Sequence, residues 1–257
     1  MLRPRDARVG WLARAAARPF ERVAQSLRGD GIDDMRRNGE QRLLRSALPA
    51  LGPEPVFFDV GANVGKWSTW AASVAPGATI HAFEPHPQAH AELERATGGL
   101  SRVRRHRLAL GAEPGTATLY TAGDITPLAS LHQRELSAYG LDTASAIEVE
   151  IGTVDAFCAE HGIDRIGFLK GDVEGHEHDL ISGARRMLER HAIDVIQFEY
   201  GGTYLDAGRR LSDVVGLFPD GYTLVKLVPW GVIPLTQEDL RDTFLLSNYA
   251  ALSPRLR

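Results

Sequence analysis

Short hydrophobic runs that lead into an acidic residue recur along most of the chain. They lie at 56–59, 79–84, 166–172 and 194–199. Between them, apolar residues follow the three- and four-residue spacing of helices, as in 65–75. Strands buried on both faces by intervening helices have this pattern. The pattern therefore predicts an α/β fold with a Rossmann-like, mixed and mostly parallel sheet and helices on both faces.

The beginning of the chain carries a helical pattern. Apolar residues recur at three- and four-residue intervals from Val9 to Leu27, with arginines between them, and this spacing indicates an amphipathic helix. Pro19 is expected to kink or split it, because proline lacks the N–H that continues the helix. We favour packing of this helix against the rest of the chain. A substrate lid, a dimer arm and attachment to an anionic surface are the alternatives.

A second helix is expected from the aspartates at 33–34, which would cap it, to Pro49. We therefore predict a helical extension at 1–50 and one catalytic domain at 51–257. The length of 257 residues is near the upper end for a single hydrophobic core and fits one catalytic domain with additions.

The loop after the first predicted strand has the residues of a nucleotide-binding turn. Asp59 precedes it, and the turn contains Gly61, Asn63 and Gly65. A dinucleotide fingerprint has glycine where Asn63 stands, because the backbone must approach a pyrophosphate closely. A carboxylate at Asp59 would repel phosphate but suits the cationic ammonium and sulfonium of S-adenosylmethionine (SAM). The loop therefore favours SAM over a nicotinamide cofactor, and a simple capped turn is the alternative.

The second predicted strand ends in Glu84, 25 positions after Asp59. Doubly wound folds place an acidic residue at about this distance, where it hydrogen-bonds ribose hydroxyls. Pro87 is expected to begin the next helix, because proline suits the first helical turn. We therefore assign Glu84 and Pro85 to the cofactor site and expect His86 to be a turn residue near the adenosine.

A third strand is expected over 103–110, and Ala109 near its end is assigned to the cofactor site. Residues 116–121 and 147–154 alternate apolar with polar or β-branched residues, which indicates a pair of inserted strands. The long connection between these two strands carries Ser130. Long connections are commonly functional, so we expect Ser130 to face a ligand.

The exit of the strand at 166–169 carries a dense group of ionisable residues. They are Asp172, Glu174, His176, Glu177, His178 and Asp179. Ligands bind beyond the carboxyl ends of the strands in an open α/β sheet. Glu199 ends the next core strand and is expected beside Asp172. The predicted catalytic residues are His176, Asp172, Glu174 and Glu199, and Asp172 is also assigned to the cofactor site.

The helix after this group is expected to carry Glu177 and Asp179 in its first turn, where its dipole favours negative charge. Closing strands are expected at 222–228, 230–235 and 243–246, in keeping with an antiparallel hairpin at the edge of the sheet.

His176 is our first choice for a general base. Its ordinary pKa of about 6.5 is close to working pH, whereas Asp172 or Glu174 would need strong desolvation to match it. A hydrogen bond within the turn is the alternative role for His176. The main hypothesis needs no metal ion. The second hypothesis is a metal-assisted reaction, in which Asp172, Glu174, His176 or Glu199 would hold Mg²⁺. The ion would lower the pKa of the substrate hydroxyl.

Composition narrows the classes of partner. The net charge of −4 gives no reason to expect nucleic acid, and a single cysteine, Cys158, excludes a disulfide within the chain and a cysteine metal cluster. No unbroken apolar run approaches about 20 residues, and arginines interrupt every candidate core of a secretory signal, so neither a membrane span nor a signal peptide is expected. We therefore expect a cytoplasmic protein that acts on a small molecule. The sequence does not decide whether it forms a homo-oligomer.

Four ordered motifs carry a resemblance to a known family. They are Phe57-Phe-Asp-Val-Gly-Ala-Asn-Val-Gly, Ala82-Phe-Glu-Pro-His-Pro, Leu169-Lys-Gly-Asp-Val-Glu-Gly-His-Glu and Ile196-Gln-Phe-Glu-Tyr. Together they resemble the FkbM-type methyltransferases over 56–246. The likeness implies a class I methyltransferase fold, SAM as donor and methylation of a hydroxyl on a sugar, polyketide or other secondary metabolite. Gly171 departs from the family, which more often has an aliphatic residue there.

The resemblance also implies roles for individual residues: Asp59, Gly61 and Glu84 bind the cofactor, and residues 172–176 line the active site. A non-catalytic SAM-binding module is the remaining alternative. Such a module would not need the acidic group at 172–179, so that group favours an enzyme.

Overall fold

The computed structural model describes residues 19–20, 23–121, 130–131, 145–236, 240 and 242–256. The predicted first helix lies outside the described residues before residue 19 and at residues 21–22. The expected bend at Pro19 therefore has no described residues before it. Most of the connection at 122–144 also lies outside them.

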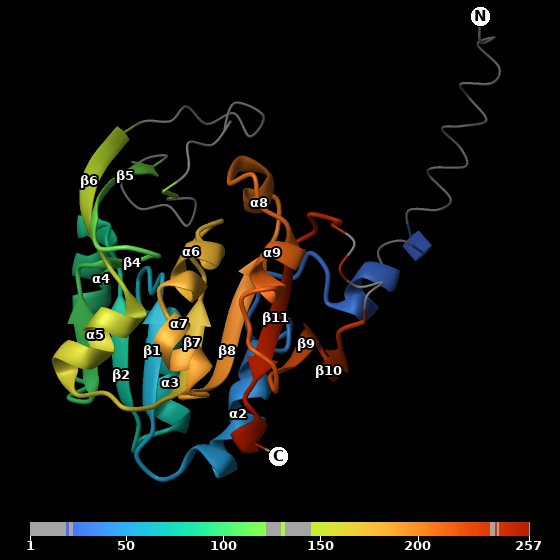
Figure 1. Cartoon of the computed structure of the whole chain (residues 1–257), viewed down its shortest axis with the longest axis horizontal. Helices are drawn as coiled ribbons and strands as arrows, with labels where there is room; N and C mark the ends of the chain where they lie inside the picture. Colours follow the sequence, from blue (N-terminus) through green and yellow to red (C-terminus); the bar gives the residue numbers. More distant parts are fainter. Residues whose placement is uncertain are drawn as a thin grey trace, which may run out of the picture.

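In the described part of the chain, eight strands form a mixed central sheet (Figure 1). In spatial order they are β10 (Gly231–Pro234), β9 (Thr223–Val228), β11 (Ser247–Leu252), β8 (Ile193–Tyr200), β7 (Ile166–Gly171), β1 (Val56–Val60), β2 (Thr79–Phe83) and β3 (Val103–His106). The strands from β8 to β3 are parallel, whereas β11 runs antiparallel to both β8 and β9. The predicted mostly parallel sheet is confirmed.

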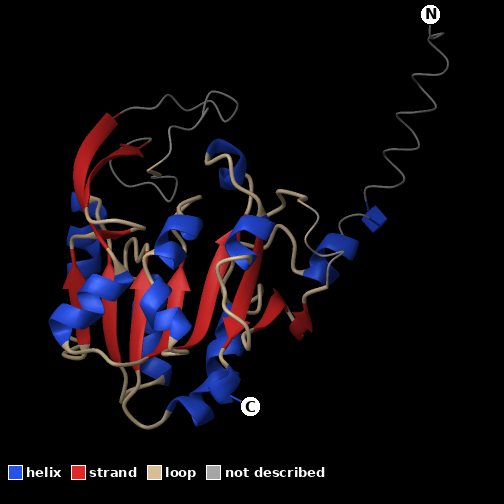
Figure 2. Cartoon of the chain, viewed as in Figure 1, coloured by secondary structure: helices blue, strands red, loops and turns tan. Residues whose placement is uncertain are grey.

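Helices cover both faces of this sheet (Figure 2). One face carries α2 (Glu40–Leu51), α3 (Lys66–Val74) and α4 (Pro87–Thr97), and the other carries α5 (Val154–His161), α6 (Glu177–Ser182), α7 (Arg185–Glu189) and α9 (Leu211–Val215). Consecutive strand residues point to opposite faces, so Phe57 packs in the first layer and Phe58 in the second. Short helices α8 (Thr203–Asp206) and η2 (Pro254–Leu256) complete the order.

The third predicted strand is divided between two sheets. β3 ends at His106 and pairs with β2, while β4 (Ala109–Leu110) pairs with β6 (Ser145–Gly152) in a smaller sheet of order β4-β6-β5. β5 (Gly115–Thr121) and β6 are the expected inserted pair, and they run antiparallel. The expected strand over 103–110 is therefore wrong in one respect, because the chain leaves the edge of the main sheet after β3.

The second N-terminal helix begins later than predicted. The Asp34 carboxylate accepts the backbone N–H of Arg36 at 3.0 Å and closes a turn, and α2 follows Gly39, whose φ is +99°. Leu44 of α2 is fully buried in the same cluster as Phe57. This helix therefore belongs to the packing of the sheet, although the sequence pattern assigns it to an extension.

The closing strands are partly as predicted. β9 and β10 form the expected antiparallel hairpin at the edge of the sheet. The strand expected at 243–246 is wrong: that segment is irregular, and β11 begins at Ser247. α5 was not anticipated, although Thr153 caps it by accepting the N–H of Ala156 at 3.0 Å and Gly162 ends it.

Candidate active site

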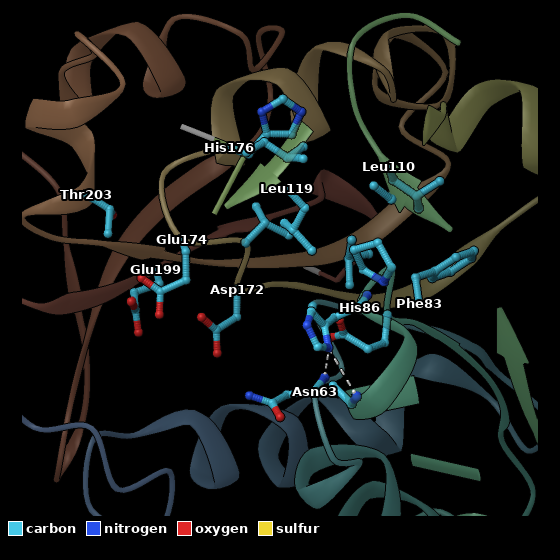
Figure 3. Close-up of a pocket in the computed structure, with 18 of the residues that line it drawn as sticks. Asn63, Phe83, His86, Leu110, Leu119, Asp172, Glu174, His176, Glu199 and Thr203 are labelled. Atoms are coloured by element: carbon cyan, nitrogen blue, oxygen red, sulfur yellow. Dashed lines mark hydrogen bonds between the residues drawn. The ribbon is translucent and has the colours of Figure 1, made fainter. Parts of the chain in front are cut away.

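A cavity of about 380 Å³ lies beyond the carboxyl ends of β1, β2, β7 and β8 (Figure 3). This is where ligands bind in open α/β sheets. Of the predicted residues, those that line it are Gly61, Asn63, Glu84, Pro85, Ala109, Asp172, Glu174, His176 and Glu199. The two predicted motif centres, far apart in sequence, therefore meet at one cavity.

The loop after β1 is held between its two neighbouring strands. The N–H groups of Gly61 and Ala62 donate to the carbonyl of Phe83 at 3.0 and 2.9 Å. Gly61 has a φ of +78°, and a Cβ built on it would lie 1.8 Å from the carbonyl oxygen of Asp172. A glycine is required here for both its conformation and the close approach of β7.

Glu84 lines the cavity and also holds the loop. Its two carboxylate oxygens accept the backbone N–H groups of Asn63 and His86, each at 2.8 Å. Burial raises the pKa of Glu84 to about 7, against these hydrogen bonds, which lower it. A carboxylate has about four acceptor positions, so two remain for a ligand. His86 caps α4, and Pro87 begins that helix as predicted.

Asp59 does not line the cavity. Its carboxylate is fully buried, accepts the Ser68 hydroxyl at 2.6 Å and lies 3.9 Å from the ammonium of Lys170. Burial raises its pKa, and Lys170 and Ser68 oppose that shift. The expected direct contact between Asp59 and the ammonium of SAM is therefore corrected: the side chain points into the interior, where it contacts Ser68 and Lys170.

Gly65 is also set back from the cavity. It precedes α3 with a φ of +80°, and a Cβ there would lie 2.7 Å from a methyl carbon of Leu93 in α4. Its role in the described structure is close packing of the two helices, which corresponds to the capped-turn alternative.

Three carboxylates converge at the ends of β7 and β8. Asp172, Glu174 and Glu199 each offer an oxygen within 4.8 Å of the others, and Figure 3 shows them on one side of the cavity. The predicted neighbourhood of Asp172 and Glu199 is confirmed. Burial raises the pKa of Glu199 well above its ordinary value, and the negative charges of Asp172 and Glu174 add to this shift. Oxygen ligands in this arrangement are of the kind that Mg²⁺ prefers.

The turn that carries Glu174 is held from behind by Glu177. Glu177 lies in the first turn of α6, as predicted, and its carboxylate accepts the N–H groups of Val173 and Gly175 at 3.0 and 3.1 Å. Glu174 itself has a φ of +52°, a conformation that is uncommon outside glycine. Ser130 donates its hydroxyl to the carbonyl of Glu174 at 2.8 Å.

Ser130 is therefore part of this support and does not face the cavity. It is buried and absent from the cavity wall, whereas the next residue, Leu131, lines it. The expectation that Ser130 faces a ligand is wrong because the hydroxyl is turned to the backbone of the 173–175 turn.

His176 lines the cavity but lies apart from the three carboxylates. Its Nδ1 is 3.4 Å from the Asp179 carboxylate. Its Nε2 lies against Gly111, and a Cβ built on that glycine would be 2.8 Å from this nitrogen. In Figure 3 its ring points away from Asp172 and Glu199. The expected grouping of His176 with the acidic residues is therefore not the arrangement of the structure.

Lys170 is a site residue that the sequence pattern did not single out. It lies in β7, is almost completely buried, and donates to Asp172 at 2.9 Å. Burial disfavours its charge, but the carboxylates of Asp172, Asp59 and Glu40 outweigh this effect and raise its pKa. The sequence did contain a signal for this role: Lys170 is a single charged residue inside an apolar strand and stands two residues before Asp172. Glu40 comes from α2 and carried no such signal.

Comparison with known proteins agrees with this geometry. Residues 59–221 match the family model described as the methyltransferase FkbM domain. The chain belongs to this family. It is therefore a methyltransferase, and its sheet is the Rossmann-like methyltransferase fold. Membership of the FkbM family implies that SAM is the methyl donor. In the described residues no helix is long and apolar enough to cross a membrane.

Several curated proteins are similar to this FkbM-domain chain. The 2-O-methyltransferase NoeI of Sinorhizobium fredii is 28% identical over 70% of the chain and 77% of that protein. The 31-O-demethyl-FK506 methyltransferase FkbM of Streptomyces tacrolimicus is 34% identical over 52% of the chain and 60% of that protein. The hexuronic acid methyltransferase AglP of Haloferax volcanii is 26% identical over 79% and 77%.

Proposed function

We propose that this protein transfers the methyl group of SAM to a hydroxyl of a small molecule such as a sugar or a polyketide. The observation that carries the proposal is the shared cavity, which joins the loop of Gly61 and Glu84 to the carboxylates of Asp172 and Glu199. One similar protein is named a 2-O-methyltransferase and another a 31-O-demethyl-FK506 methyltransferase, and both names support a hydroxyl acceptor.

The cavity suits SAM in shape and chemistry. Glu84 keeps two acceptor positions for ribose hydroxyls, and Gly61 lets the end of β1 approach the backbone of Asp172 closely. Phe83 and Leu110 give an apolar wall beside Pro85 for a base ring. Asp172 would then face the positively charged end of the cofactor, a role that the sequence pattern assigned to Asp59.

The chain has two tasks in the proposed reaction. SAM supplies an activated methyl group, so the protein must align the acceptor hydroxyl and take its proton. Alignment contributes up to about 7–11 kcal/mol, and a positioned base about 10²–10⁴-fold in rate. We propose that Glu199 takes the proton, because it lies in the acidic group beside Asp172 and its raised pKa makes it a stronger base than an ordinary carboxylate. Glu174 would orient the hydroxyl.

The two candidate bases can be separated by substitution. Glu199→Gln should lower turnover by about 10²–10⁴-fold with nearly unchanged SAM affinity, whereas His176→Ala should change turnover little. The assay would follow S-adenosylhomocysteine release with a panel of sugar and polyketide alcohols. The reverse result would return the role to His176. Methylation only at nitrogen or carbon would contradict the proposed reaction.

A divalent-metal reaction is the second candidate. The observation that favours it is the convergence of Asp172, Glu174 and Glu199 within 4.8 Å, which gives three oxygen ligands. A bound Mg²⁺ would lower the pKa of the hydroxyl. In that case EDTA should abolish activity and Mg²⁺ or Mn²⁺ should restore it, while Asp172→Ala should not respond to added metal. Activity that resists prolonged chelation would eliminate an exchangeable metal.

A further inference from the structure

The helix over 23–28 turns an apolar stripe to solvent. Val23 and Leu27 are four residues apart, so they share one side of this helix, and each is 60% exposed. Phe20, in the described pair of residues before the helix, is 78% exposed. Ala24 and Gln25 are partly buried on the other side. The expectation that this stripe packs against the rest of the chain is therefore wrong for the described residues.

The edge hairpin continues this exposed surface. Trp230, between β9 and β10, is 59% exposed, and Val232 in β10 is 40% exposed. The indole N–H of Trp230 donates to the carbonyl of Leu27 at 3.2 Å, which joins the hairpin to the helix end, and Figure 1 shows the two elements beside each other. We refer to Phe20, Val23, Leu27, Trp230 and Val232 as the apolar face.

The sequence that includes the helix of the apolar face is strongly basic. Residues 1–28 contain seven arginines against Asp6 and Glu21, although the whole chain has a net charge of −4. Arg28 adjoins Leu27; its side chain is 61% exposed and pairs with the buried Asp30 carboxylate at 3.2 Å. Arg42 is exposed next to the hairpin and donates to the carbonyl of Pro229 at 3.3 Å. An exposed apolar face on an arginine-rich segment of sequence, with Arg28 and Arg42 beside it, complements a negatively charged surface.

We propose that the apolar face docks on an anionic membrane surface. Phe20 and Leu27 would enter the boundary between headgroups and acyl chains, and Trp230 would lie at that boundary, where its ring is apolar and its N–H already has a partner. The arginines would contact lipid phosphates, an attraction that acts within about 8–10 Å at moderate salt.

Docking in this way would also orient the active site. Asp33, five residues after the helix, lines the cavity, and Gly31 donates its N–H to the carbonyl of Leu246, another cavity residue, at 2.7 Å. The docked helix would thus be joined through a short, hydrogen-bonded segment to the cavity wall.

The test is co-sedimentation of the full purified chain with vesicles. We expect the chain to sediment with phosphatidylcholine vesicles that contain phosphatidylglycerol and to stay in the supernatant with pure phosphatidylcholine vesicles. Binding to the anionic vesicles should weaken as the salt concentration increases. Leu27→Asp and Trp230→Asp should each weaken binding about tenfold, because an apolar contact is replaced by a charge that the surface repels. Leu205→Asp is the matched control: Leu205 is also 60% exposed but lies in α8, so its substitution should leave binding unchanged.

Circular dichroism and thermal unfolding would first confirm that each variant is folded. A wild-type chain that stays in the supernatant with anionic vesicles overturns the proposal, as does a folded Leu27→Asp variant that binds like the wild type. If light scattering gives a dimer that Leu27→Asp converts to a monomer, and vesicles do not bind, the apolar face is an interface between two copies and the membrane proposal is also overturned.

Discussion

Replacement of Lys170 by methionine should strongly destabilise the fold. The Lys170 side chain is 8% exposed and its ammonium lies 2.9 Å from Asp172 and 3.9 Å from the fully buried carboxylate of Asp59. Methionine keeps the aliphatic volume but leaves the carboxylates without their cation. Removal of one partner from a buried ion pair costs about 3–5 kcal/mol, and we expect a loss of this size in the free energy of unfolding.

Urea denaturation at neutral pH would measure this loss. Arg185→Met is a control, because Arg185 pairs with Glu189 at 2.9 Å on the surface, where ion pairs contribute little. The double variant Lys170→Met/Asp59→Asn should recover part of the lost stability, since the uncompensated buried charge is gone. A loss below about 1 kcal/mol in Lys170→Met, the level of an exposed pair, would refute the reasoning.

Two further predictions concern the loop glycine and a buried histidine pair. Gly61→Ala should cost about 1–3 kcal/mol or more of stability because its Cβ would meet the Asp172 carbonyl. Gly31→Ala, at a similar φ with no atom near, is the control, and equal urea midpoints would contradict the clash. His81 and His106 contact each other at 3.1 Å, and burial above all lowers their pKa values to about 3 and about 4. The unfolded chain binds these protons near pH 6.5, so this stability should be complete above pH 6.5 and be lost as the pH falls towards 3. Urea midpoints for wild type and His81→Asn at pH 7 and pH 4.5 would check this, and an equal fall in both would contradict it.

The central parallel strands were predictable because their sequences are mostly apolar. β1, β2, β7 and β8 are buried on both faces, so their sequences show the burial directly. β11 was missed because it contains Ser247, Asn248 and small alanines. Its burial results from long-range pairing with β8 and β9, which leaves no local hydrophobic pattern.

The site was predictable where a motif lies at a strand end. Glu84, Asp172 and Glu199 follow buried strands, and strand ends meet at one edge of a parallel sheet, so their convergence followed from topology. The direction of side chains did not follow: Asp59 points into the interior and His176 away from the carboxylates. Such directions depend on tertiary packing, including contacts from Glu40 and Ser68 that no local pattern reports.

The most direct test of the account is calorimetric titration of the wild-type chain and the Glu84→Ala variant with SAM and with NAD. We predict that the wild type binds SAM and not NAD. Glu84→Ala, checked for folding, should bind SAM about tenfold or more weakly, because one hydrogen bond to a charged group contributes about 1.5–3 kcal/mol. Tight binding of NAD, or identical SAM titrations for the wild type and the folded Glu84→Ala variant, would contradict the assignment of this cavity to the methyl donor.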